Sequence, residues 1–122
     1  MLNNKRALVI VAHGSRREAS NDEVRQLAEN IAIKVGDRFM QVESAFLELA
    51  EPSIPDGIEK CIQAGAEEVI VLPYFLSAGR HVSQDIPAEV EIKRKQYPHT
   101  TISIAGYLGA DERVVDLMAS LV

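Results

Sequence analysis

The sequence has little of what marks disulfide-rich, metal-cluster or membrane proteins. It holds one cysteine, Cys61, and no tryptophan. This excludes an internal disulfide, a cysteine-based zinc site and a protein-ligated Fe–S cluster within one chain. No apolar run approaches the roughly 20 residues of a membrane span, and the apolar run near the N-terminus is too short for a signal peptide. A cytoplasmic protein with no membrane partner is therefore expected.

Positive charge is also scarce. The 13 lysine and arginine residues are outnumbered by 18 acidic residues, so the formal net charge is −5. Proteins that bind nucleic acids through bulk charge usually carry the opposite sign, so no nucleic-acid partner is expected. Hydrophobic residues at 47% and charged residues at 25% are typical of a globular protein. The length of 122 residues predicts a single domain over 1–122.

Apolar segments predict four β-strands. The runs at 7–12 and 69–73 are continuous rather than alternating, which is typical of strands that are buried on both faces of a parallel sheet. The segments 42–47 and 101–105 are weaker candidates, identified by their β-branched and aromatic residues.

Helical patterns separate these strands. Residues 20–23 (Ser-Asn-Asp-Glu) have the form of a capping box and predict the start of a first helix, which ends at Gly36. Ser53 is expected to cap a second helix. A third helix covers 86–97, with acidic residues early and basic residues late, and Asp111 caps a final one. The alternation predicts an α/β fold with three layers, α/β/α, around a four-stranded parallel sheet. The only long stretch expected to be irregular is 74–84, after the third strand, and long loops in compact domains are often functional.

Polar residues follow three of the predicted strands. Ligands of open α/β sheets bind beyond the carboxyl ends of the strands. The segments found there are His13-Gly14-Ser15-Arg16-Arg17, Phe46-Leu47-Glu48 and Leu76-Ser77-Ala78-Gly79-Arg80-His81. The imidazoles of His13 and His81 and the carboxylate of Glu48 suggest an N,N,O metal site with open positions, since imidazole suits Co, Fe, Ni and Zn.

Each of these residues also has a plainer interpretation. His13 could simply bond a loop carbonyl, Glu48 could be a solvated charge, and His81 could be a surface side chain. These interpretations weaken when taken together, because three polar groups would have to meet at one sheet edge by chance. By contrast, His99 is expected on the surface at the opposite edge, and Cys61, on an apolar helix face, is expected in the core.

With these residues the sequence resembles the small sirohydrochlorin chelatases, the short form of the class II tetrapyrrole chelatases. The matching pieces run in order over nearly the whole chain: Ala12-His13-Gly14-Ser15-Arg16, Phe46-Leu47-Glu48, Pro52-Ser53-Ile54, Pro73-Tyr74-Phe75-Leu76, Gly79-Arg80-His81-Val82 and Asp85-Ile86-Pro87. The resemblance implies insertion of Co²⁺, Fe²⁺ or Ni²⁺ into sirohydrochlorin, with the metal as a substrate and no permanently bound cofactor. It also implies that His13 and His81 handle the metal and that Glu48 is the active-site carboxylate.

The residue types suit that chemistry. Chelation removes pyrrole protons while a metal is delivered, and a neutral imidazole can accept a proton or bind a metal. A neighbouring carboxylate stabilises the positive charge that gathers there. The three arginines of these loops could pair with substrate carboxylates, although at least one of them could be only a solvated charge. The predicted substrate-binding residues are Ser15, Arg16, Arg17, Ser77 and Arg80.

The sequence thus predicts a tetrapyrrole metal chelatase with Co²⁺ as the favoured metal. The alternative is a non-catalytic carrier of metal or tetrapyrrole, whereas a purely structural domain is disfavoured by the three polar segments. One four-stranded domain offers only half of a cleft to a large flat ring. A homodimer is therefore expected in which the strand-end loops of two copies face each other.

Overall fold

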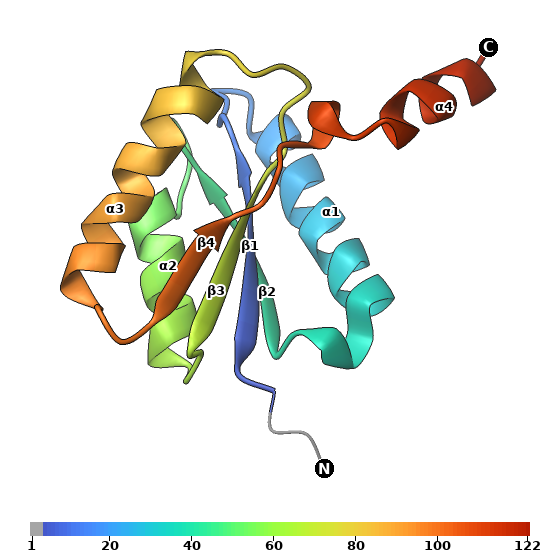
Figure 1. The fold of residues 1–122 in the computed structure, drawn as a ribbon. Coiled ribbons are helices and arrows are strands. Elements are labelled where there is room, and N and C mark those ends of the chain that lie inside the picture. The colour runs from blue at the N-terminus through green and yellow to red at the C-terminus, as the bar shows by residue number, and fades with distance from the viewer. Residues whose placement is uncertain (1–3) are drawn as a thin grey trace.

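A four-stranded parallel sheet lies at the centre of the structure, a computed structural model that describes residues 4–122 (Figure 1). Its strands are β1 (Arg6–Ala12), β2 (Gln41–Phe46), β3 (Glu68–Pro73) and β4 (Thr101–Ile104), in the spatial order β2-β1-β3-β4. All neighbouring strands pair in parallel. The four strands predicted from the sequence are confirmed to within one residue at each end.

Helices cover both faces of this sheet. One face carries α1 (Glu18–Val35), and the other carries α2 (Ile54–Gln63) and α3 (Ile86–Gln96), as Figure 1 shows. The predicted three-layer α/β/α arrangement is therefore confirmed. The last helix, α4 (Arg113–Ser120), follows the short turn η3 (Leu108–Ala110) and leads away from the layers.

The core has two halves, one on each side of β1. Residues 7–12 of this strand are all buried, which explains why the run is apolar without alternation. Val9 and Val11 pack with α2 and α3, whereas Leu8 and Ile10 face α1. Cys61 of α2 is fully buried as predicted, and burial raises the pKa of its thiol to about 12. The thiol therefore stays protonated and is a packing group rather than a nucleophile or ligand.

Two of the predicted helix starts have different outcomes. Ser53 caps α2 as expected, because its side-chain oxygen accepts a hydrogen bond from the Asp56 N–H at 3.2 Å. The predicted capping box at residues 20–23 is wrong. The helix α1 already begins at Glu18, and the Ser20 N–H donates to the Arg17 carbonyl in its first turn.

The stretch after β3 is more ordered at its end than the sequence indicated. Residues 74–84 were expected to be irregular, but a single π-helical turn, η2 (His81–Asp85), runs directly into α3. In a π-helical turn the backbone hydrogen bonds span five residues instead of four, and such turns are frequent at functional sites. Within residues 4–122, no helix is both long enough and apolar enough to cross a membrane.

Candidate functional site

Three chain segments meet at the carboxyl edge of the sheet, and they carry the predicted histidines and glutamate. His13 follows β1, Glu48 follows β2, and His81 opens the π-helical turn after β3. The ring centroids of His13 and His81 lie 4.6 Å apart with their planes tilted by 54°. His13 Nε2 lies 2.9 Å from Glu48 Oε2. The structure therefore brings the three side chains together at one edge of the sheet, as the sequence predicts.

Backbone hydrogen bonds join the first two segments. The Leu47 N–H donates to the Ala12 carbonyl at 3.0 Å, and the Glu48 N–H donates to the His13 carbonyl at 3.1 Å. Gly14 sits at this junction with a positive φ of 95°, a conformation that favours glycine. A Cβ on Gly14 would lie 1.7 Å from the Glu48 carbonyl oxygen, so only a residue without a side chain lets the two segments approach this closely.

Both ring nitrogens of His13 face oxygen acceptors. Nδ1 lies 3.0 Å from the Gly14 carbonyl oxygen, and Nε2 lies 2.9 Å from the Glu48 carboxylate. A neutral imidazole has one N–H donor and can satisfy only one of these contacts, whereas an imidazolium satisfies both. The space between Nε2 and Glu48 is therefore suited to a cation, either a proton or a metal ion.

His81 contacts a different carboxylate and, unlike His13, keeps one ring nitrogen free. Its Nδ1–H donates to Asp85 Oδ2 at 2.8 Å, one helical turn further along the chain. We assign the tautomer from this contact, since a carboxylate can only accept. The lone pair then lies on Nε2, which is the atom available to a proton or a metal. The ring of Phe75, 6.3 Å away, flanks the imidazole.

Asp85 was not predicted as a site residue. The sequence offered a signal, because His81 and Asp85 are four residues apart and such pairs share one face of a helix. That signal was missed because residues 74–84 were interpreted as an irregular loop, in which a four-residue spacing has no such meaning. The π-helical turn supplies the helical geometry that brings the two side chains together.

Asn21 is a second residue that the sequence analysis missed. It is 1% exposed, and its side chain binds the backbone of Ser15 twice: it accepts from the Ser15 N–H at 2.9 Å and donates to the Ser15 carbonyl at 2.8 Å. Its position three residues before Val24 and seven before Ala28 already placed it on the buried face of α1. Asn21 therefore holds the loop after β1 in place from inside the fold.

We expect Asn21→Ala to lower the free energy of unfolding by about 1–3 kcal/mol, the cost of leaving buried polar groups without partners. Denaturant unfolding measures this effect. Asn30→Ala is the matched control, because Asn30 lies on the same helix but is exposed. Equal stability of the two variants would contradict the role of Asn21.

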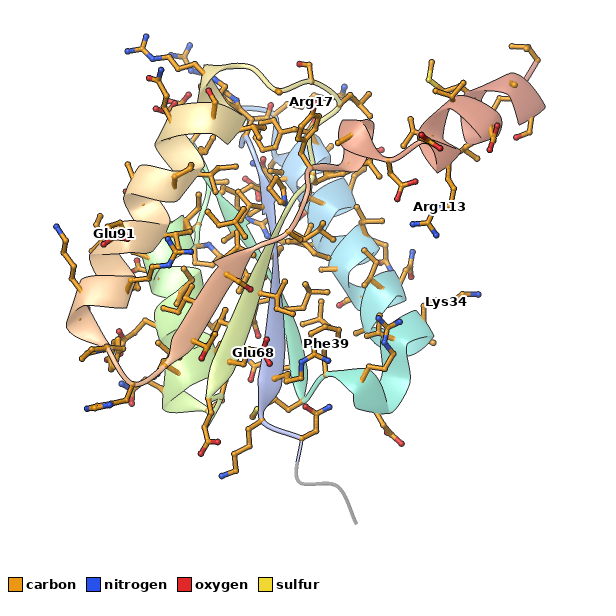
Figure 2. The ribbon with its side chains drawn as sticks, viewed as in Figure 1. Arg17, Lys34, Phe39, Glu68, Glu91 and Arg113 are labelled. Carbon is orange, nitrogen blue, oxygen red and sulfur yellow. The ribbon has the colours of Figure 1, made fainter. Side chains whose placement is uncertain are left out.

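The predicted substrate-binding residues lie at the same edge but make fewer side-chain contacts than the histidines do. Arg16, Arg17 and Arg80 are exposed, and no ion pair in residues 4–122 includes any of them. Figure 2 shows Arg17 at this edge of the sheet. The Ser15 hydroxyl accepts a hydrogen bond from the Arg17 N–H at 3.0 Å, and Ser77 is exposed on the loop after β3. His99 is exposed, as predicted.

An open hollow of about 430 Å³ lies beside His81. It is lined by Leu47, Glu48, His81, Asp85, Ala88 and Glu89. Three carboxylates in this lining attract cations rather than anions. Within residues 4–122, no group of three or more histidine, cysteine, aspartate or glutamate side chains is arranged to hold a metal ion. The side chains lie instead as two pairs, His13 with Glu48 and His81 with Asp85, and the metal-binding role of His13 and His81 stays a prediction.

The fold and site together define a class: a parallel α/β domain that gathers two imidazoles and carboxylates at the carboxyl edge of its sheet. The family model named CbiX matches residues 7–122. The chain therefore belongs to the CbiX family, and the sequence-based resemblance to the sirohydrochlorin chelatases is confirmed at the level of the family.

Individual relatives agree with this assignment. The chain is 38% identical to the chloroplastic sirohydrochlorin ferrochelatase of Arabidopsis thaliana, over 91% of this chain and 48% of that protein. It is 32% identical to the sirohydrochlorin cobaltochelatase of Sulfolobus acidocaldarius, over 91% of this chain and 85% of that protein. The solved structure of the chelatase SirB from Bacillus subtilis subspecies spizizenii, in complex with cobalt, superposes with a TM-score of 0.85 at 35% identity, covering 95% of this chain and 49% of that one.

The relatives also differ from this chain in size. The chain spans about half the length of most of the curated relatives it matches, including the Arabidopsis protein and two from Priestia megaterium and Bacillus subtilis. The Sulfolobus protein is close to it in length.

Proposed function

We propose that this domain inserts a divalent metal, with Co²⁺ favoured over Fe²⁺ and Ni²⁺, into sirohydrochlorin. The observation that carries the proposal is the pair of imidazoles with centroids 4.6 Å apart, each bound to its own carboxylate at the open edge of the sheet. Relatives named sirohydrochlorin ferrochelatase and cobaltochelatase support it. The metal is a substrate in this proposal, and the cytoplasmic location stays a prediction.

Two proton transfers must accompany the insertion. The free macrocycle carries pyrrole N–H protons where the metal binds, and each leaves as a metal–nitrogen bond forms. The Nε2 of His81 has the lone pair to accept one of them, because Asp85 holds the proton on Nδ1. The carboxylate of Asp85 also stabilises the imidazolium that results.

The His13–Glu48 pair is the proposed entry point of the metal ion. A metal ion entering between Nε2 and Oε2 displaces to solvent the proton that joins them, and the negative charge of Glu48 offsets the positive charge of the ion. When the ion leaves for the macrocycle, the vacated Nε2 of His13 accepts the second pyrrole proton. Few protein ligands suit this role, since the metal must leave for the macrocycle and a closed four-ligand site holds it too well.

The macrocycle is a flat ring edged with carboxylates. Arg16, Arg17 and Arg80 are free in the described structure to pair with them, and Ser15 and Ser77 lie in the same loops. Tyr74 and Leu76, 43% and 69% exposed, offer apolar surface to the ring. Phe75 packs against the core instead and reaches the site only through its contact with His81.

The proposed active form is a homodimer. The hollow beside His81 is open on one side, whereas ligand sites usually bury most of their ligand. In a two-fold homodimer, the commonest kind of oligomer, a second copy supplies the opposite wall. In this arrangement the strand-end loops of the two copies face one substrate.

Incubation of the protein with sirohydrochlorin and Co²⁺, followed by absorbance, tests the proposed activity. A chelatase gives many turnovers per chain above the non-enzymatic rate. A single spectral shift, stoichiometric with protein, would instead identify a carrier of the metal or the tetrapyrrole and would overturn the proposal.

We expect Glu48→Gln to lower the insertion rate by about 10²-fold, because the amide keeps the size of the side chain but removes the charge that offsets the metal. Glu91→Gln is the matched control: Glu91 lies on α3 away from the site, as Figure 2 shows, and its change should leave the rate unaltered. Steady-state rates at saturating Co²⁺ make the comparison. If Glu48→Gln matched the control, Glu48 would be only a solvated side chain.

A further inference from the structure

Leu49, the residue after Glu48, has a backbone conformation that is uncommon for leucine. Its φ is 67°, in the left-handed region, and within residues 4–122 it is the one residue other than glycine with a positive φ. Such a conformation costs energy and persists only where the surrounding structure enforces it. The side chain of Leu49 is 52% exposed, so its own packing does not supply this constraint. The backbone on either side of Leu49 must therefore be held by other groups.

Hydrogen bonds hold the chain on both sides of this turn. Before Leu49, two backbone N–H groups join the chain to the segment after β1, as described above. After Leu49 the chain turns back, and the Phe46 N–H donates to the Pro52 carbonyl at 2.9 Å. Between these anchors, the Glu51 carbonyl accepts from Arg25 Nη2 at 3.1 Å. Within residues 4–122, this is the one hydrogen bond from a side chain of α1 to residues 47–53.

The guanidinium of Arg25 is itself held in place on α1. Its Nη1 donates to the carboxylates of Glu18 and Asp22, at 2.8 Å in the second case. Its carbon lies 5.2 Å from the centroid of the Phe46 ring, which is fully buried. A planar guanidinium has several donors in fixed directions, so it can serve carboxylates and a carbonyl together while it stacks on an aromatic ring. The carboxylates thus fix the guanidinium, and the guanidinium fixes the Glu51 carbonyl.

We propose that Arg25 is a positioning residue for Glu48. By holding the Glu51 carbonyl, Arg25 keeps Leu49 in the left-handed conformation, and this conformation sets the path of the chain that carries Glu48. Without this clamp, Leu49 relaxes to an ordinary φ, and the Glu48 carboxylate moves away from Nε2 of His13.

This inference deepens the proposed function by naming a residue that acts on the active-site glutamate, and it rests on that proposal only for the reaction itself. Within residues 4–122, Arg25 hydrogen-bonds neither Glu48 nor His13, so its effect passes through the turn. The placement of Glu48 is measured without metal or tetrapyrrole. Failure of the clamp and failure of the chelatase activity are therefore distinguishable.

Hydrogen exchange of single amides, followed by NMR, measures this placement. We expect Arg25→Gln to speed exchange of the Glu48 N–H by about 10-fold, because its bond to the His13 carbonyl opens when the turn relaxes. The N–H of Val9 in β1 reports global unfolding and should change much less. Lys34→Gln is the matched control: Lys34 is an exposed cation at the far end of α1 (Figure 2), and its loss should leave both rates unaltered. Equal changes at Glu48 and Val9, or none, would overturn the proposal.

Steady-state kinetics with sirohydrochlorin and Co²⁺ show whether the clamp matters for the reaction. Arg25→Gln should lower kcat by about 10-fold, less than the loss expected for Glu48→Gln, because Glu48 is still present but less well placed. The KM for sirohydrochlorin should stay unaltered. A higher KM with an unaltered kcat would assign Arg25 to direct binding of a substrate carboxylate and would overturn the positioning role. If the unaltered protein had no activity, the proposed function would fall, whereas the exchange result would still decide the role of Arg25.

A further substitution tests whether Arg25 acts through Leu49. Asparagine adopts the left-handed conformation more readily than leucine does, so the turn needs less support from the clamp in Leu49→Asn. In this background, the effect of Arg25→Gln on exchange of the Glu48 N–H should fall from about 10-fold to about 3-fold or less. An effect of the same size with leucine and with asparagine at position 49 would show that Arg25 does not act through this turn and would overturn the proposal.

Discussion

His81→Ala is expected to lower the metal-insertion rate by about 10²–10⁴-fold, the range for loss of a positioned acid–base group. Asp85 holds the proton on Nδ1 of His81, so Nε2 of His81 keeps a lone pair. The Nε2 of His13, by contrast, is already in contact with Glu48. The melting temperature should change little, because the side chain is 45% exposed and supports no core cluster.

The comparison needs a histidine that is not part of the site. His99→Ala removes an exposed imidazole beyond the end of α3, and it should leave both the insertion rate and the melting temperature unaltered. Rates are measured with Co²⁺ and with Fe²⁺, after subtraction of the non-enzymatic reaction. A well-folded His81→Ala variant with a near-normal rate would remove this residue from the mechanism.

Gly14→Ala is expected to affect both stability and activity. The residue has a φ of 95°, and holding an alanine there costs about 1–3 kcal/mol in the backbone alone. The added Cβ also meets the Glu48 carbonyl oxygen at 1.7 Å, so the segments carrying His13 and Glu48 must separate. Misplacement of reacting groups by about 1 Å can cost about 10²-fold in rate, and we expect a loss of at least this size.

Gly79→Ala provides the matched control. Gly79 lies in the neighbouring loop after β3, its φ is not in the left-handed region, and nothing lies within 4 Å of an added Cβ. This variant should unfold at the same denaturant concentration as the unaltered chain and retain its rate. If Gly14→Ala behaved in the same way, close approach of the two segments would not be needed for the site.

The strands and the place of the site could be predicted from local sequence. The segments 7–12 and 69–73 are apolar without alternation because both of their faces are covered, and this requirement acts on each residue separately. Once the strands were identified as parallel, the carboxyl ends of β1, β2 and β3 had to share one edge, which is why His13, Glu48 and His81 were predicted together.

The starts of elements were predicted less well where a side chain had a distant partner. The residues 20–23 fit a capping box, but Asn21 is committed to the backbone of Ser15 and α1 begins earlier, at Glu18. In the same way, Asp85 became a partner of His81 only because residues 81–85 form a π-helical turn. Local propensity does not contain this information, since both bonds depend on how a loop lies against a helix.

The sequence by itself determined the layer order, the buried strands and the three residues that meet at the sheet edge, because apolar burial and strand direction are encoded within single elements. Only the tertiary structure decided that both nitrogens of His13 face acceptors whereas Nε2 of His81 stays free, because these acceptors come from backbone and side chains placed by packing. It also decided the direction of α4. The apolar residues of this segment predict a helix, but only the fold shows that α4 leads away from the layers with no residue buried.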